Sequence, residues 1–213
     1  MKLTIIGKNG NFGSFLNELL SPHFEICDEA PSVILATPIS SYNELGAKYK
    51  DKHLINVCSV QKPSTDILLK HTDRVTSIHP LFGRRTPADK RNSILTHSCN
   101  ANNDIWFSEE SIENNFIISF IKVSNVIYFD NSQPLTLDEK YPRFTPESHD
   151  ILMSKTHVAA VMAAKQLQIY IDRAKNIPDE LIPNSFRLMR EFVKTLDDMP
   201  PGTTESILAN PYL

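Results

Sequence analysis

The sequence predicts an α/β fold, in which a mostly parallel sheet is covered by helices and is followed by a small all-helical domain. Three observations lead to this prediction. Short apolar runs of strand length alternate with amphipathic helical segments through the first half of the 213-residue chain. A glycine-bearing turn joins the first apolar run to the first helical segment. From residue 145 onward only helical periodicity remains, so we expect one domain over 1–144 and a second over 145–213.

Composition excludes several classes of function. The net charge is -3 with both signs mixed along the chain, which argues against a nucleic-acid-binding face. The three cysteines form no C-x-x-C pair, and neither they nor the histidines have metal-ligand spacing, so we expect no metal and a reducing, cytoplasmic setting. No apolar run approaches the roughly 20 residues that span a bilayer, and we expect no membrane association.

The elements of the first domain follow one another in a regular order. The first helix is expected from Asn11 to Ser21, where Pro22 ends it, and Ser41-x-x-Glu44 is typical of a capping box. The interval between residues 28 and 33 has no room for a further helix and strand, so the sheet should be trimmed there. Strands are expected over 3–6, 24–27, 32–38, 53–58, 75–78, 94–97 and 126–129, with further helices from Ser64 to His71 and from Ser108 through Phe120.

The second domain is expected to be helical throughout. Residues 130–143 are polar with no clear period and indicate a linker or surface loop. Thr145-Pro146-Glu147 then combines a hydroxyl cap, an early proline and an acid, which is typical of a helix start. The long helix that follows is apolar on more than one side, which predicts burial by other helices or by another subunit. A further helix is expected to turn Phe186, Met189, Val193 and Leu196 inward.

The glycine turn indicates a Rossmann-type dinucleotide site. Gly7, Gly10 and Gly13 follow the first strand, and Asp28 follows the second, in the order that brings backbone N–H groups to a pyrophosphate and an acid to a ribose hydroxyl. The charge of Asp28 would repel a 2′-phosphate, which favours NAD while leaving NADP open. The turn reads G-x-x-G-x-x-G, with Lys8 in place of a glycine, and a turn without a ligand is the alternative. The expected cofactor-binding residues are Gly7, Gly10, Asn11, Phe12, Gly13, Asp28, Thr37 and Pro38.

A second polar cluster lies where two later strands end. His79 follows one strand and Ser59 follows the preceding one, and ligands of α/β folds bind at the carboxyl edge of the sheet. A histidine there can accept a proton from a substrate hydroxyl while hydride leaves the same carbon. The residues alone leave open whether His79 is such a base or a loop-capping histidine beside Pro80.

These motifs together resemble the prephenate and arogenate dehydrogenases of tyrosine biosynthesis. The similarity is spread over most of the chain, and the His-Pro-x-Phe-Gly motif with the later His-Asp pair is its specific part. The segments that carry it are Gly10-Asn11-Phe12-Gly13, Ser59-Val60-Gln61-Lys62, His79-Pro80-Leu81-Phe82-Gly83, Thr145-Pro146-Glu147-Ser148-His149-Asp150 with Met153, and Phe186-Arg187.

The resemblance implies an NAD(P)-dependent oxidoreductase that oxidatively decarboxylates a cyclohexadienol without a metal. It implies that His79 is the base, that Ser59 binds the hydroxyl or orients His79, and that Arg187 pairs with a substrate carboxylate. It also implies a homodimer formed through the C-terminal helices. Nothing in the sequence separates prephenate from arogenate as the small-molecule substrate.

Three features differ from the family. Val161 stands where the family has a substrate-pocket histidine, and His157 lies one turn earlier and takes that role in our prediction. Arg84 and Arg85 follow the Phe-Gly motif, where some members have an acid, and are either anion ligands or solvated charges. The helical domain is also short. We interpret His149-Asp150 as a helix start with local hydrogen bonds rather than as a metal site or catalytic triad.

Two other functions remain open. The first is a hydroxyacid dehydrogenase or small reductase of the same domain plan, for which Lys165 on the long helix is the only candidate catalytic lysine. The second is a non-catalytic nucleotide-binding or regulatory module, which the trimmed sheet, Lys8 and Val161 favour.

Overall fold

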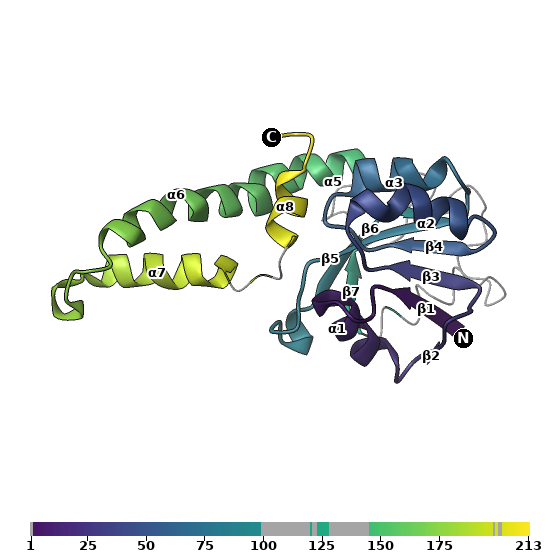
Figure 1. Cartoon of the computed structure of the whole chain (residues 1–213), viewed down its shortest axis with the longest axis horizontal. Coiled ribbons are helices and arrows are strands. Elements are labelled where there is room, and N and C mark those ends of the chain that lie inside the picture. Colours follow the sequence, from purple (N-terminus) through teal and green to yellow (C-terminus); the bar gives the residue numbers. More distant parts are fainter. Residues whose placement is uncertain (1, 99–119, 121–122, 128–144, 198, 200–201) are drawn as a thin grey trace. The chain divides into compact units, whose positions relative to one another are not determined.

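The chain divides into two compact units, 1–150 and 151–213 (Figure 1). The computed structural model describes residues 2–98, 120, 123–127, 145–197, 199 and 202–213. The expected helix from Ser108 to Phe120 lies outside these residues apart from Phe120 itself, as does the expected linker over 130–143. The division leaves the first turn of the long C-terminal helix with the sheet, so that His149 and Asp150 belong to the first unit.

The first unit is built on a seven-stranded sheet with the order β2-β1-β3-β4-β5-β6-β7. Its strands are β1 Lys2–Ile6, β2 Glu25–Ile26, β3 Ser32–Leu35, β4 His53–Asn56, β5 Val75–Pro80, β6 Asn92–Ser98 and β7 Asn125–Ile127. Strands β1 to β5 pair in parallel, β6 runs antiparallel to β5, and β7 is parallel to β6. The reversal at β6 has a local cause, because the connection from β5 contains only the 3-10 turn Ala88–Lys90 and no crossover helix.

The predicted α/β class with a mostly parallel sheet is confirmed, and so is the trimmed edge. Strand β2 pairs only with β1 and stands at one end of the strand order, because residues 27–31 are too few to add a helix and a strand outside it. Strands β3 and β4 are buried at every position. This burial is typical of parallel strands covered on both faces.

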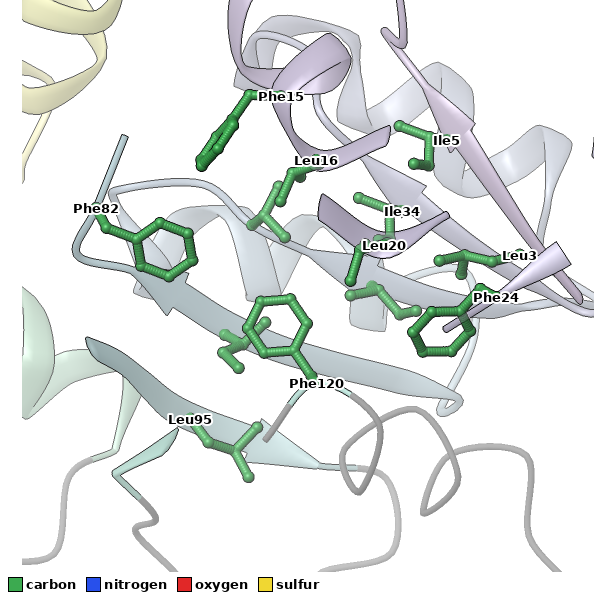
Figure 2. Close-up of a cluster of buried hydrophobic side chains, with 13 residues drawn as sticks. Leu3, Ile5, Phe15, Leu16, Leu20, Phe24, Ile34, Phe82, Leu95 and Phe120 are labelled. Carbon is green, nitrogen blue, oxygen red and sulfur yellow. The ribbon is translucent and has the colours of Figure 1, made fainter. Parts of the chain in front are cut away.

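Helices cover both faces of the sheet. Helix α1, Asn11–Leu20, lies on one face, and α2, Tyr42–Lys48, and α3, Gln61–Leu69, lie on the other (Figure 1). The first cluster of buried side chains joins α1 to β1 and β5, and includes Leu3, Leu16, Ile78 and Phe120 (Figure 2). The second joins α2 and α3 to β3 and β4, and includes Leu35, Tyr42, Leu54 and Leu68.

The predicted capping box at Ser41 is wrong. A 3-10 turn, Ile39–Ser41, precedes α2 and gives Ser41 a helical backbone with φ -87° and ψ -9°, and its side chain makes no cap hydrogen bond. The Ser41 hydroxyl instead donates to the carbonyl oxygen of Pro38 at 2.8 Å. It also lies 2.9 Å from the hydroxyl of Thr37, so Ser41 secures the turn that follows β3 rather than the helix start.

The second unit is a helical hairpin with a short additional helix. Its first arm begins with the last turn of α5, Pro146–Met153, and continues through a π-helical turn, Ser154–Val158, into α6, Ala159–Arg173. A 3-10 turn, Asp179–Leu181, then leads to α7, Asn184–Asp197, and α8, Thr203–Leu208, follows. Helices α6 and α7 lie side by side in opposite directions (Figure 1).

The start of α5 follows the prediction. The Ser148 N–H donates to the Thr145 hydroxyl at 3.1 Å, and the Thr145 N–H donates to the Ser148 hydroxyl at 2.8 Å. This reciprocal pair satisfies two backbone donors at the end of the helix. Among the described residues, no helix is long and apolar enough to cross a membrane.

Candidate active site

The predicted site residues of the first unit gather at one edge of the sheet. Strands β1, β3, β4 and β5 are parallel neighbours, so their carboxyl ends point the same way. The glycine turn follows β1, and Thr37 and Pro38 follow β3. Ser59 lies three residues beyond the end of β4, and His79 is the second-last residue of β5. Since Asn56 of β4 pairs with Ser77 of β5, the two catalytic candidates come from adjacent strands.

Close backbone approach requires two of the three glycines. Gly7 has a φ of +89°, and a Cβ atom on it would lie 2.3 Å from the Ala36 carbonyl oxygen and 3.1 Å from the Thr37 methyl group. A Cβ atom on Gly13 would lie 2.0 Å from the Gly7 carbonyl oxygen. The turn is therefore pressed between the end of β3 and the first turn of α1, which places Gly7, Gly13 and Thr37 together.

The N-terminus of α1 fits an anionic ligand. Gly10 occupies the N-cap position and no side-chain cap bonds the first N–H groups of the helix. Uncapped N–H donors and the positive end of the helix dipole attract phosphate groups. Asn11 is exposed at this end, whereas Phe12 packs against the core and anchors the helix. The turn therefore offers backbone donors and a favourable dipole to an anionic group, as a pyrophosphate site requires.

Lys8 forms an ion pair with Asp28. The Lys8 Nζ lies 2.8 Å from the Asp28 Oδ1, and both side chains are exposed. The hydrogen bond and the positive charge of Lys8 lower the pKa of the Asp28 carboxyl, so the predicted ribose ligand is ionised at neutral pH. Nothing in the sequence indicates that these two residues are partners, and the structure brings them together across the ends of β1 and β2.

His79 lies in a buried chain of hydrogen bonds that sequence analysis missed. Its Nδ1 lies 2.9 Å from the Nε2 of His149, and the two rings meet nearly at right angles, at 79°. The Nδ1 of His149 lies 2.8 Å from the Oδ1 of Asp150. The Asp150 carboxylate also accepts the backbone N–H groups of Gln61 and Lys62, each at 2.8 Å. His79 is 2% exposed, and His149 and Asp150 are 0% exposed.

The interpretation of His149-Asp150 as a purely local helix start is therefore wrong. Asp150 caps the N-terminus of α3, a helix 89 residues earlier in the chain at Gln61. This cap also corrects the predicted helix start, because α3 begins at Gln61 rather than at Ser64. A carboxylate at the positive end of a helix is favourable, and here it also orients a histidine.

A polar network fixes the loop that carries Ser59. The Asn56 Oδ1 accepts the Cys58 N–H at 2.9 Å, and the Asn56 Nδ2 donates to the Ser64 hydroxyl at 2.7 Å and to the Ser77 hydroxyl at 3.2 Å. All of these polar side chains are fully buried. Tyr42 donates to the Leu35 carbonyl at 2.9 Å, and burial raises the pKa of its phenol well above 10, so it is neutral. The hydrogen bonds of Asn56, at the end of β4, thus hold both the loop at Cys58 and the start of α3 at Ser64.

The remaining predicted substrate ligands have protein partners of their own. The Arg84 guanidinium pairs with the Glu18 carboxylate on α1, with its Nη2 3.0 Å from the Glu18 Oε1, and this pairing raises the pKa of Arg84. In the second unit, the Arg187 Nη2 donates to the Asp179 carbonyl at 2.7 Å and its Nε donates to the Ile182 carbonyl at 3.3 Å. Both arginines secure local structure in this arrangement.

The helical unit accounts for two other residues. His157 is half-buried in the π-helical turn, whereas Val161 is 2% exposed and packs with Val158 and Ile207 in the core of the unit. Val161 therefore acts as a core residue where the family has a histidine. Lys165, the candidate lysine of a hydroxyacid dehydrogenase, is exposed on α6.

The fold defines a Rossmann-type α/β domain followed by a helical unit. No protein-family model matches the chain, and no curated protein matches it in sequence. Among solved structures it matches a protein from Corynebacterium glutamicum that is provisionally assigned as a prephenate dehydrogenase, with a TM-score of 0.64 and 13% identity over 97% of this chain and 73% of that one.

Two further matches are named as a prephenate dehydrogenase and an arogenate dehydrogenase. The prephenate dehydrogenase of Aquifex aeolicus, solved with hydroxyphenyl propionate and NAD+, has a TM-score of 0.61 and 14% identity over 98% of this chain and 82% of that one. The arogenate dehydrogenase of Synechocystis has a TM-score of 0.56 and 13% identity over 99% of this chain and 84% of that one. The predicted resemblance is thus confirmed in fold, because these three solved structures are named as prephenate or arogenate dehydrogenases.

Proposed function

We propose that this protein is a nicotinamide-dependent dehydrogenase that oxidatively decarboxylates prephenate or arogenate. The observation that carries the proposal is the buried contact of 2.9 Å between His79 and His149 at the carboxyl edge of a Rossmann-type sheet. A general base must be held in one orientation at the place where ligands bind, and the buried hydrogen bond to His149 holds His79 in this way. The motif similarity and the fold neighbours support the same reaction.

The residues of the chain then have distinct tasks in this reaction. His79 accepts the proton of the substrate hydroxyl, and Ser59 hydrogen-bonds that hydroxyl or orients His79. NAD, when bound, accepts the hydride from the carbon that bears the hydroxyl. Loss of carbon dioxide makes the ring aromatic, which drives the reaction without a metal. Arg187 remains a proposed ligand of a substrate carboxylate on the strength of the Phe186-Arg187 motif, since a guanidinium suits a carboxylate. Arg84 and His157 remain proposed substrate ligands that would take the place of family residues that this chain lacks.

Turnover is the experiment that tests this function. Purified protein is incubated with each pairing of NAD or NADP with prephenate or arogenate, and reduced nicotinamide is followed by its absorbance. Reduced cofactor formed with either substrate would establish the reaction and identify cofactor and substrate together. If NAD binds by calorimetry but no pairing reacts, the proposed reaction is wrong and the chain is a dinucleotide-binding module. Oxidation of aliphatic hydroxyacids would favour the hydroxyacid dehydrogenase instead.

We further propose that NAD is the better cofactor but that Lys8 lets the site accept NADP. Asp28 alone would repel a 2′-phosphate, whereas the ammonium group at 2.8 Å supplies an opposite charge at the same place. Lys8→Ala is expected to weaken NADP binding about tenfold, which corresponds to roughly 1.4 kcal/mol, and to change NAD binding much less. Calorimetric dissociation constants for both cofactors measure the difference.

The control for Lys8 is Lys2→Ala. Lys2 is also exposed and also pairs with an acid on β2, Glu25 at 3.5 Å, but it begins β1 instead of following it. The Lys2 variant should bind both cofactors as the unmodified protein does. Equal weakening of NAD and NADP by Lys8→Ala would contradict the proposed role of Lys8.

A homodimer through the C-terminal helices is the proposed assembly. Apolar side chains of this unit are exposed, among them Met162 at 53%, Ile169 at 46% and Leu188 at 57%. Large exposed apolar side chains on one unit support an interface there. Leu188→Glu is expected to shift the protein toward monomer, because the charge would have to be buried between two copies. Sedimentation equilibrium over a range of concentrations measures the shift.

Lys194→Gln is the matched control for the assembly. It makes the same change of charge on the same helix, α7, without touching an apolar side chain. It should leave the association constant unchanged. A protein that stays monomeric at every concentration before any substitution would rule out the dimer.

A further inference from the structure

The function proposed above uses only one nitrogen of His79, whereas the structure has a second buried histidine and a buried carboxylate behind it. The line runs from His79 Nδ1 to His149 Nε2 at 2.9 Å, and from His149 Nδ1 to Asp150 Oδ1 at 2.8 Å. It ends at the backbone N–H groups of Gln61 and Lys62. A cap for α3 needs only the carboxylate, so the cap does not explain why His149 is placed between Asp150 and His79.

The hydrogen bonds fix the position of each proton when both histidines are neutral. An ionised carboxylate only accepts hydrogen bonds, so the hydrogen of His149 lies on Nδ1 and faces Asp150. His149 then has its lone pair at Nε2, and His79 must donate to it from Nδ1. The lone pair of His79 is consequently at Nε2, on the opposite side of the ring. Asp150 therefore determines, through His149, which nitrogen of His79 is basic.

The same contacts permit one other arrangement. If His149 is protonated on both nitrogens, His79 accepts at Nδ1 and carries its hydrogen on Nε2. The two arrangements differ by one proton, and the first becomes the second when His79 Nε2 gains a proton while the Nδ1 proton shifts along the 2.9 Å contact to His149. The positive charge then lies on His149, directly beside the Asp150 carboxylate, instead of on His79.

We propose that His149 and Asp150 are positioning residues that form a proton relay with His79, holding the substrate proton between hydride transfer and aromatisation. The relay rests on the proposed function. As hydride leaves the ring carbon, the hydroxyl O–H bond breaks and an N–H bond forms at His79 Nε2. The N–H bond at His79 Nδ1 breaks as one forms at His149 Nε2, so His79 stays neutral.

The proton returns in the second half of the reaction. When carbon dioxide departs, the electron pair of the broken carbon–carbon bond completes the aromatic ring, and the ring oxygen becomes a phenolate. His79 Nε2 gives its proton to this oxygen, and His149 Nε2 returns a proton to His79 Nδ1. Protein and solvent thus exchange no net proton during the cycle. The buried carboxylate stabilises the charged intermediate state without contact with water.

The first test needs neither substrate nor turnover. The full chain has 7 histidines, which are labelled with 15N and observed by two-dimensional NMR at neutral pH. The signals of His79 and His149 are assigned from the spectra of His79→Asn and His149→Gln. We expect both rings to carry their hydrogen on Nδ1, the minor form of histidine in water. Hydrogen on Nε2 of either neutral ring would overturn the relay.

The second test separates a relay from simple positioning. In His149→Gln the amide oxygen still accepts the His79 Nδ1–H but takes up no proton, whereas His149→Leu removes both abilities. We expect kcat of His149→Gln to fall about 10-fold to 100-fold with little change in KM, and kcat of His149→Leu to fall at least as far. A His149→Gln enzyme with unchanged kcat would overturn the relay and leave a positioning role only.

Control measurements distinguish a failed relay from a misfolded variant and from a failure of the proposed function. Thermal unfolding and NAD affinity are measured for both variants, so that a loss of kcat with an intact fold is assigned to His149 itself. If the unmodified protein turns over no substrate, the proposed function fails. The NMR result then still decides whether Asp150 sets the protonated nitrogens of His149 and His79.

Discussion

His79→Asn is expected to lower kcat by about 100-fold to 10,000-fold, the contribution of a general base, while NAD affinity stays nearly unchanged. The reason lies in the geometry of the ring. The amide of asparagine can replace the Nδ1–H that donates to His149, so the buried contact of 2.9 Å keeps a partner. It provides no basic atom where Nε2 would face the substrate. Steady-state kinetics and calorimetry with NAD measure the two effects separately.

His71→Asn is the matched control for this substitution. His71 lies just after α3 and its Nε2 is 3.0 Å from the Asn43 Oδ1 in an exposed contact. This variant should keep the kcat of the unmodified enzyme. Full activity in His79→Asn would show that another group takes the hydroxyl proton, and the assignment of the base would then fail.

The sequence predicts the order of the sheet domain well, because each strand there has a local signal. The run at β3 is continuously apolar or small, and the run at β4 has an apolar centre between His53 and Asn56; both strands are buried at every position. Only residues 29–31 separate Asp28 from the third strand, and this short interval predicts the trimmed edge at β2 because a crossover needs more chain than that. Spacing along the chain carries this information by itself.

The hydrogen-bonded chain behind His79 has no such local signal. Asp150 contacts the N–H groups of residues 89 and 88 positions earlier, and His149 contacts His79 across 70 positions. The motif similarity singled out both segments without indicating that they meet. The predicted start of α3 at Ser64 is wrong for the same reason. The helix begins at Gln61, where the distant Asp150 carboxylate caps it, and not at the nearby hydroxyl of Ser64.

The Lys8–Asp28 pair could be predicted only in part from the sequence. In the sequence, Lys8 stands out as a departure from the glycine pattern, and Asp28 stands out as a predicted ribose ligand. The parallel pairing of β1 with β2 brings the two residues that follow these strands to the same edge. The strand pairing therefore joins two separate sequence features into one charged pair, and the proposed role of Lys8 in cofactor choice depends on this pair.

Gly13→Ala is expected to destabilise the protein by more than about 2 kcal/mol and to abolish most NAD binding. Gly13 lies inside α1, where helix propensity alone would favour alanine by about 1 kcal/mol. The new Cβ atom would lie 2.0 Å from the Gly7 carbonyl oxygen and 2.6 Å from its carbon. Both are backbone atoms of the turn, so the clash is relieved only by moving the helix away from the glycine turn. Urea unfolding gives the change in the free energy of unfolding.

Two other glycines provide a graded comparison. A Cβ atom on Gly83 meets no heavy atom within 4 Å, so Gly83→Ala should change stability by less than about 0.5 kcal/mol. A Cβ atom on Gly10 would lie 3.3 Å from the Gly7 carbonyl oxygen, a contact that a small shift relieves, and its variant should fall between the two. If Gly13→Ala were as stable as the unmodified protein, the gain in helix propensity would have outweighed the clash between the new Cβ atom and the Gly7 carbonyl group. The helix would then stand further from the glycine turn, and the fit of that turn to a pyrophosphate would lose its structural basis.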